Sequence, residues 1–148
     1  MNSHEQLVQL LFNKVCAILK ADGLTLRIIK RKGKITKGRY LKGYINLRKR
    51  IIGLDIYTPK KMEPKSFNGL IRTICHEVAH LQKLPYKQYY KRHWIIRQHY
   101  PAFYKQIERN INKIKKDATL GAHFEQDAKK RPLHQRDSLP RGKAGEAS

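Results

Sequence analysis

Two histidines and a glutamate are the residues of this sequence whose types and spacing most clearly suggest chemistry. His76, Glu77 and His80 lie in the stretch Cys75-His76-Glu77-Val78-Ala79-His80-Leu81. On a helix, residues four apart project from the same side, so both imidazoles can bind one Zn²⁺ at about 2.0–2.1 Å. Glu77 then stands beside the metal, where it can take a proton from water as a general base. The spacing therefore predicts a metal-dependent hydrolase.

The helix that must carry these residues is predicted from its apolar spacing. Ser66 opens the helix and Pro85 ends it. Its apolar face points roughly away from the two histidines, so core packing on one side leaves them facing a cleft. Cys75 lies about 100° around the helix from His76 and is expected to be buried apolar filler. The apolar face consists of Phe67, Leu70, Ile71, Ile74, Val78 and Leu81.

A catalytic zinc site needs three protein ligands and an open position. The extended motif of the metzincins fails here, because Lys83 stands where glycine should and Tyr86 where histidine should. His99, just ahead of a predicted helix start, is the preferred third ligand. Glu108 on the following helix and His93 are the alternatives. The remaining histidines, expected to be unrelated, are His4, His123 and His134.

The motif H-E-x-x-H, followed after one to two dozen residues by H-x-P-x-F opening a helix, resembles the SprT-like zinc metallopeptidases. That family includes the Spartan-type proteases of DNA–protein crosslink repair. The resemblance implies that His76, His80 and His99 bind zinc and that Glu77 is the catalytic base. It also implies that Phe103 is an aromatic anchor. Proteins bound or crosslinked to DNA are the substrates that the resemblance implies.

The resemblance covers roughly residues 7–114 and implies a minimal, small zincin-like domain. Tyr100 stands where the family usually has glycine after the third histidine. The bacterial members carry a C-terminal zinc ribbon, for which this chain, with Cys16 and Cys75, lacks the cysteines.

Periodicity predicts the other elements. Apolar residues at helical spacing predict an N-terminal helix over residues 3–20 with Ser3 as N-cap, and alternation predicts strands over 24–28, 39–46 and 51–58. A short helix or helical connection is expected over 86–98, and Pro101 opens the last helix. The order predicts an α+β fold with a three-stranded, mostly antiparallel sheet. Residues 1–121 are expected to form the domain and residues 122–148 a flexible basic or polar tail.

The chain is strongly basic, with 33 Lys and Arg against 11 Asp and Glu among 148 residues, a formal net charge of +22. Such a charge attracts polyanions, of which nucleic acid is the commonest. A second basic segment, residues 83–97, interleaves cations with Tyr86, Tyr89, Tyr90 and Trp94, a pattern that suits stacking on single-stranded nucleic acid. The first candidates for DNA contact, however, lie between Asp22 and Asp55: Lys30, Arg31, Lys32, Lys34, Arg48, Lys49 and Arg50.

Several classes of protein are excluded by composition. No apolar run approaches the ~20 residues that cross a bilayer. The polar start of the chain does not predict a secretory signal, and two cysteines do not form a disulfide scaffold, so an intracellular protein with free thiols and no disulfide-linked partner is expected.

The preferred interpretation is a zinc metallopeptidase that acts on DNA-associated proteins. The main rival is a non-catalytic nucleic-acid-binding protein with a structural zinc. A third possibility keeps the hydrolase but not the DNA: a zincin that cleaves a regulator, or a hydrolase of non-peptide bonds.

Overall fold

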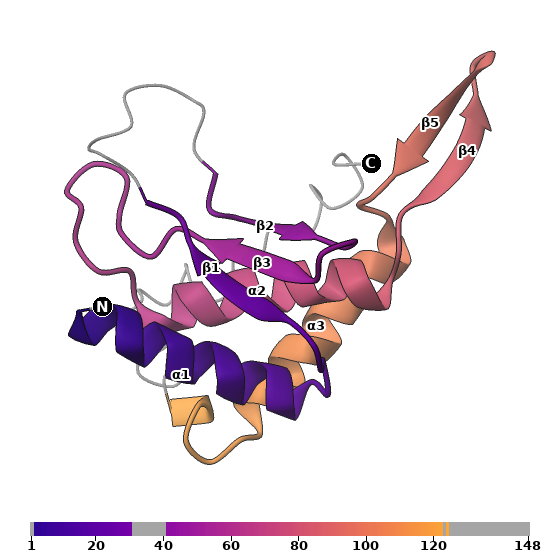
Figure 1. The fold of residues 1–148 in the computed structure, drawn as a ribbon. Helices are drawn as coiled ribbons and strands as arrows, with labels where there is room; N and C mark the ends of the chain where they lie inside the picture. The colour runs from indigo at the N-terminus through magenta and orange to yellow at the C-terminus, as the bar shows by residue number, and fades with distance from the viewer. Residues whose placement is uncertain (1, 31–40, 123, 125–148) are drawn as a thin grey trace, which may run out of the picture. The chain divides into compact units, whose positions relative to one another are not determined.

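The elements of the fold are three helices and two small sheets among residues 2–30, 41–122 and 124, which the computed structural model describes. This mixture confirms the predicted α+β class. The chain divides into two compact units, Met1–Val78 and Ala79–Ser148, and the division falls inside α2. Residues 125–148, most of the expected tail, lie outside the described residues. In chain order (Figure 1) the elements are α1 (Ser3–Ile18), β1 (Thr25–Ile28), β2 (Gly43–Asn46), β3 (Ile51–Leu54), α2 (Phe67–Gln82), β4 (Tyr86–Tyr90), β5 (His93–Arg97) and α3 (Pro101–Lys115).

Helix α1 begins at a side-chain cap and buries one apolar face. The Asn2 side-chain oxygen accepts a hydrogen bond from the Glu5 backbone N–H at 2.8 Å. Asn2 is therefore the N-cap, and the prediction that Ser3 caps the helix was wrong by one residue. A cap of this kind is worth about 1 kcal/mol. The apolar residues of α1 that enter the core are Val8, Leu11, Phe12, Val15 and Cys16.

The first unit contains a three-stranded sheet in the order β1-β3-β2. β2 and β3 are antiparallel neighbours, while β1 runs parallel to β3, so the sheet is mixed. Gly53 in β3 has a steric reason to be glycine. A Cβ at this position would clash with the Tyr44 ring of the neighbouring strand, which crosses directly over Gly53.

Helix α2 follows its sequence prediction closely. It starts directly after Ser66, whose Oγ accepts a hydrogen bond from the Gly69 backbone N–H at 3.2 Å, and it ends at Gln82, ahead of Pro85. The residues that were expected on its apolar face pack inward at four fully buried positions: Leu70, Ile71, Ile74 and Val78. Because this face is anchored in the core, the rotation of the helix about its axis is set.

Residues 86–97 form a β-hairpin, so the expectation of a short helix here was wrong. β4 and β5 pair antiparallel, with Tyr86 opposite Arg97 and Tyr90 opposite His93. The segment is rich in Tyr, Trp and Ile, which favour strands. The turn residues Lys91 and Arg92 have φ angles of 46° and 67°, as a two-residue turn with both central residues at positive φ requires. The usual Asn-Gly signal of that turn is absent, which is why the sequence did not reveal it.

Helix α3 begins at Pro101, as predicted. Proline suits the first turn, where its missing N–H costs no hydrogen bond. The helix buries Phe103, Asn110 and Ile114. No helix in the described part of the chain has both the length and the apolar composition needed to cross a membrane.

The two cysteines are buried thiols that form no disulfide, with exposed fractions of 8% for Cys16 and 0% for Cys75. Burial raises the pKa of Cys16 to about 11 and that of Cys75 to about 12. Since the thiolate is the reactive form, we expect both thiols to resist a disulfide reagent at pH 8 in the native protein and to react completely after unfolding in guanidinium chloride. Rapid labelling of Cys16 in the native protein would contradict this packing.

Candidate metal centre

Helix α2 presents the two histidines of the motif one turn apart. His80 is buried, with 8% of its surface exposed, and His76 is half-buried. The helical periodicity places both imidazoles on the same side of α2, opposite the face anchored by Ile74 and Val78.

The third histidine, His99, lies on the short segment that joins β5 to α3. The Nε2 atom of His99 lies 3.2 Å from Nε2 of His80. One potential ligand atom from each of His76, His80 and His99 lies within 4.8 Å of the other two. The three residues that were predicted as ligands therefore form one cluster of imidazoles.

The spacing of the imidazole nitrogens fits a zinc ion. Two ligands of a tetrahedral zinc, each about 2.0–2.1 Å from the metal, are roughly 3.3–3.4 Å apart. The 3.2 Å separation between His80 and His99 is close to that value. Burial also lowers the pKa of His99, which favours the neutral imidazole that metal ligation requires. By donor type and spacing, the cluster can hold zinc.

Aromatic packing and one hydrogen bond hold His99 in place. The ring of Phe103, which is fully buried on α3, lies 4.4 Å from the His80 ring and 5.1 Å from the His99 ring, centroid to centroid. Next to His99, the Tyr100 hydroxyl donates a hydrogen bond to the Leu84 carbonyl at 2.8 Å. Tyr100, which departs from the pattern of the resembled family, thus joins the start of α3 to the loop that follows α2.

An amide pair also joins the end of α2 to α3, and sequence reasoning missed it. Asn110, fully buried, donates from Nδ2 to Oε1 of Gln82 at 2.7 Å. The bond keeps the C-terminal turn of α2, which carries His80, beside the helix that carries Phe103. A sequence offers no signal for a pair of neutral amides 28 residues apart.

Glu77 is a buried carboxyl group directly after His76 on α2. Only 7% of the residue is exposed, and burial raises its pKa to about 7. A carboxyl with a raised pKa binds a proton more readily than an exposed glutamate does, which suits a group that must receive a proton during a reaction.

The alternative third ligands lie elsewhere. Glu108 is exposed on α3, and His93 is exposed at the start of β5, with its Nδ1 3.1 Å from the Lys91 carbonyl. Among the described residues, neither belongs to the cluster. The His4 ring nitrogen lies 3.0 Å from the Ile56 carbonyl in the first unit. Two histidines lie outside the described residues: His123 and His134.

The residues predicted to contact DNA are described only in part. Lys30 donates to Oε1 of Glu5 at 2.7 Å, so its charge is partly neutralised although 75% of its side chain is exposed. Arg48, Lys49 and Arg50 are exposed in the turn between β2 and β3. Three of the predicted residues lie outside the described residues: Arg31, Lys32 and Lys34.

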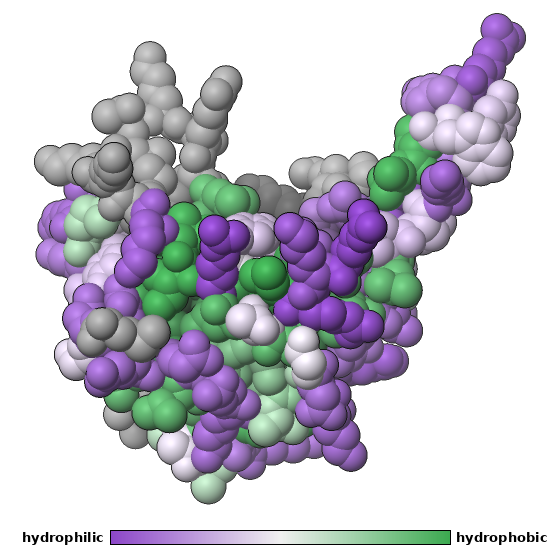
Figure 2. Space-filling model, in the orientation of Figure 1, coloured by the Kyte–Doolittle hydropathy of each residue, from purple (hydrophilic) through white to green (hydrophobic). Residues whose placement is uncertain are grey.

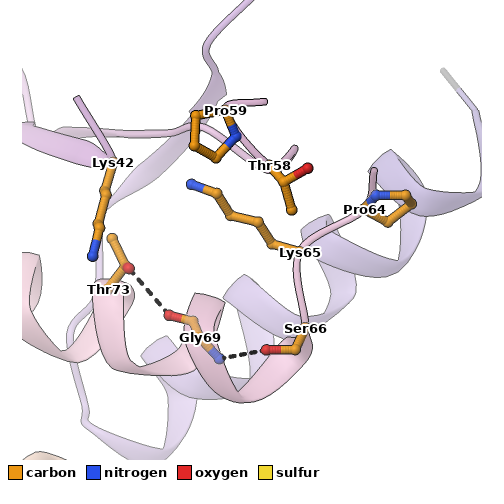
Figure 3. Close-up of a pocket in the computed structure, with 8 residues that line it drawn as sticks. All are labelled: Lys42, Thr58, Pro59, Pro64, Lys65, Ser66, Gly69 and Thr73. Atoms are coloured by element: carbon orange, nitrogen blue, oxygen red, sulfur yellow. Dashed lines mark hydrogen bonds between the residues drawn. The ribbon is translucent and has the colours of Figure 1, made fainter. Parts of the chain in front are cut away.

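A separate hollow of about 540 Å³ lies in the first unit at the start of α2 (Figure 3). The side chains of Lys42 and Lys65 reach into it, beside the turn in which Ser66 accepts the Gly69 N–H. The described residues that line it carry no carboxyl or imidazole group, unlike the histidine cluster and Glu77.

Comparisons with known proteins give little further information. No protein-family model matches this chain, and no curated protein matches it. Among solved structures, the chain is similar to the crystal structure of the metallopeptidase zymogen abylysin of Pyrococcus abyssi, with 19% identity and a TM-score of 0.43, over 89% of this chain and 99% of that one. A similarity at that level establishes no relationship, and the metal centre is assigned from this chain's own residues.

Replacing His99 tests the third ligand. We expect His99→Ala to weaken zinc affinity by more than roughly 100-fold, because loss of even a ligand's hydrogen-bond partner costs 10–100-fold. The matched variants His93→Ala and Glu108→Gln should bind zinc as the wild type does. The measurement is a zinc titration against a fluorescent chelator. Zinc affinity that survives in His99→Ala but falls in Glu108→Gln would assign the site to the glutamate instead.

Proposed function

We propose that this protein is a zinc-dependent metallopeptidase. The observation that carries the proposal is the convergence of three imidazoles from His76, His80 and His99. The buried Glu77 follows His76 directly on α2. Three ligands are the number that catalytic zinc sites use, since the fourth position is needed for water or substrate.

The reaction divides between the metal and the protein. When bound, zinc supplies Lewis acidity, which polarises a peptide carbonyl and acidifies water. Glu77 takes the proton of the attacking water and then passes it to the nitrogen of the departing amine. His76, His80 and His99 would hold the metal through their ring nitrogens, and Phe103 packs against the rings of His80 and His99.

The segment from His99 to Phe103 favours the SprT-like type among such peptidases. Its proline opens α3, and its phenylalanine packs against His80 and His99, so each residue of the H-x-P-x-F pattern has a structural task at the metal centre. A purely structural zinc explains the site less well, because the buried Glu77 directly after His76 would then have no functional role.

The net charge of +22 supports an association with nucleic acid, which makes proteins bound to DNA the proposed substrates. Nucleic acid that binds both the peptidase and its target raises their effective concentration for each other. The exposed Arg48, Lys49 and Arg50 contribute phosphate contacts.

Replacing Glu77 separates metal binding from hydrolysis. We expect Glu77→Gln to retain one zinc per chain but to cleave a basic DNA-binding protein at least about 100-fold more slowly, since a general base contributes 10²–10⁴-fold. The control Glu108→Gln makes the same chemical change at an exposed position and should cleave normally. The readouts are zinc content and the rate of appearance of new peptide N-termini.

Two results would contradict the proposal. Equal cleavage by wild type and Glu77→Gln would remove the assigned base. Absence of zinc from both proteins, with zinc present during purification, would remove the metal centre.

Single-stranded DNA tests the substrate class in the same assay. If the substrates are DNA-associated proteins, adding single-stranded DNA should accelerate cleavage by the wild type, and the acceleration should disappear as salt is raised. Cleavage at one rate with and without DNA would favour a peptidase that acts independently of nucleic acid.

A further inference from the structure

The β4–β5 hairpin exposes large flat side chains to an unusual degree. Within the second unit it extends as an arm from the start of α3 (Figure 1). Its exposed fractions reach 68% for Trp94, 60% for Tyr89 and 62% for Ile96. Figure 2 shows hydrophobic and hydrophilic surface side by side along this arm. An exposed patch of aromatic rings on a basic protein marks a binding surface.

The pairing of the strands determines which residues share a face. Lys87 is opposite Ile96, and Tyr89 is opposite Trp94, so these four residues lie on one face of the hairpin. The rings of Tyr89 and Trp94 are 5.4 Å apart and tilted. Next to them, a hollow of about 420 Å³ is lined by Lys87, Trp94, Ile95 and Ile96. This face, called the ring face below, offers two aromatic surfaces and one cation.

The turn of the hairpin places two cations in a backbone conformation that is energetically unfavourable for their residue types. Lys91 and Arg92 have φ angles of 46° and 67°. Asn and Gly adopt this left-handed conformation much more easily than other residues, and a two-residue turn usually contains them. Strained residues of this kind tend to mark functional positions. The turn therefore carries two positive charges at the expense of its own stability.

The charge of the arm is positive throughout. Residues 83–97 contain no Asp or Glu. Lys91 Nζ lies 5.3 Å from the centre of the Tyr90 ring, and Arg97 Cζ lies 5.6 Å from it, so cations also flank the ring on the other face. The basic residues of the arm are Lys87, Lys91, Arg92 and Arg97, and Lys83 precedes it.

We propose that the β4–β5 hairpin is a binding arm for single-stranded nucleic acid, in which bases stack on Tyr89 and Trp94 and phosphates contact Lys87, Lys91 and Arg92. The inference rests on the proposed association with nucleic acid and is independent of the hydrolytic chemistry. Bases stack on exposed aromatic rings whatever their sequence, and the neighbouring cations follow the backbone.

The alternation of charge and rings favours this occupant over an anionic membrane surface. Elements that lie in a membrane interface separate an apolar face from a cationic one. On this hairpin, Lys87 stands on the ring face itself, and Arg97 and Tyr90 share the opposite face. Paired duplex bases expose no ring surface for stacking, so the ring face selects unpaired bases.

Within the second unit, the arm leads directly into the segment that carries His99. Its second strand leads through Gln98 into His99, and its base is fixed by the Tyr100–Leu84 hydrogen bond and by the edge-on contact of Tyr86 with Tyr100, 5.0 Å between ring centres. Nucleic acid on the arm is thereby held next to the segment that carries the third histidine.

A turn substitution separates charge from stability. In Lys91→Asn/Arg92→Gly the new residues suit the left-handed turn, so the thermal midpoint should stay the same or rise. The affinity for a fluorescein-labelled oligothymidylate should fall, and the slope of log K against log salt should shrink by about 1.4, or 0.7 for each lost phosphate contact. The matched control Lys105→Gln/Arg109→Gln removes two exposed cations of α3 and should leave that slope nearly unchanged.

A second pair of variants tests stacking. Tyr89→Leu/Trp94→Leu keeps an apolar ring face but removes both flat rings, and its Kd for the oligonucleotide should rise more than about ten-fold. Tyr89→Phe/Trp94→Phe keeps flat rings and should bind within about three-fold of the wild type.

Each outcome is decisive. Equal losses in the turn variant and its α3 control, or full binding by the leucine variant, would overturn the arm while leaving the association with nucleic acid intact. Failure of the wild-type protein to bind the oligonucleotide would overturn both. Binding of the arm to phosphatidylserine vesicles that the oligonucleotide does not compete away would assign it to membranes instead.

Discussion

The close approach of two imidazoles, His80 at the end of α2 and His99 before α3, is the constraint on which the second unit is built. Their nitrogens lie 3.2 Å apart, and Phe103 packs against both rings. Placing two such groups together is unfavourable if both are protonated, and burial lowers the pKa of His99, which favours its neutral form. Two hydrogen bonds help to keep the imidazoles close together. The Asn110–Gln82 bond joins α3 to the end of α2, and the Tyr100–Leu84 bond fixes the chain just before α3.

The sequence predicted most of what lies along a single helix and less of what depends on partners far away in the chain. The position of α2, its anchored face and the orientation of His76 and His80 follow from local periodicity. The choice of His99 over His93 and Glu108 needed the resemblance to a family, because three candidates follow His80 at acceptable distances. The sequence could not supply the amide pair of Asn110 and Gln82, which is a tertiary contact with no spacing rule.

The β4–β5 hairpin, which was predicted as a short helix, is the element whose secondary structure matters most for the proposed nucleic-acid binding. Tyrosine, tryptophan and isoleucine with interspersed cations give neither a clean period of two nor one of 3.6, and the turn lacks the residues that usually announce it. A helix would spread Tyr89 and Trp94 about 140° apart around its axis, at 100° per residue, whereas paired strands set them opposite each other on one face. Tyr89 and Trp94 form one stacking surface only because they lie opposite each other on paired strands.

Binding of one zinc ion by the three imidazoles can be observed directly. X-ray absorption at the zinc edge, measured on the purified wild-type protein, tests it most directly. We expect one zinc per chain with three imidazole nitrogens at about 2.0–2.1 Å and one further light-atom ligand, with no sulfur, since both thiols are buried in the core. A spectrum that requires sulfur ligands or fewer than three imidazoles, or a protein that binds no zinc, would contradict it.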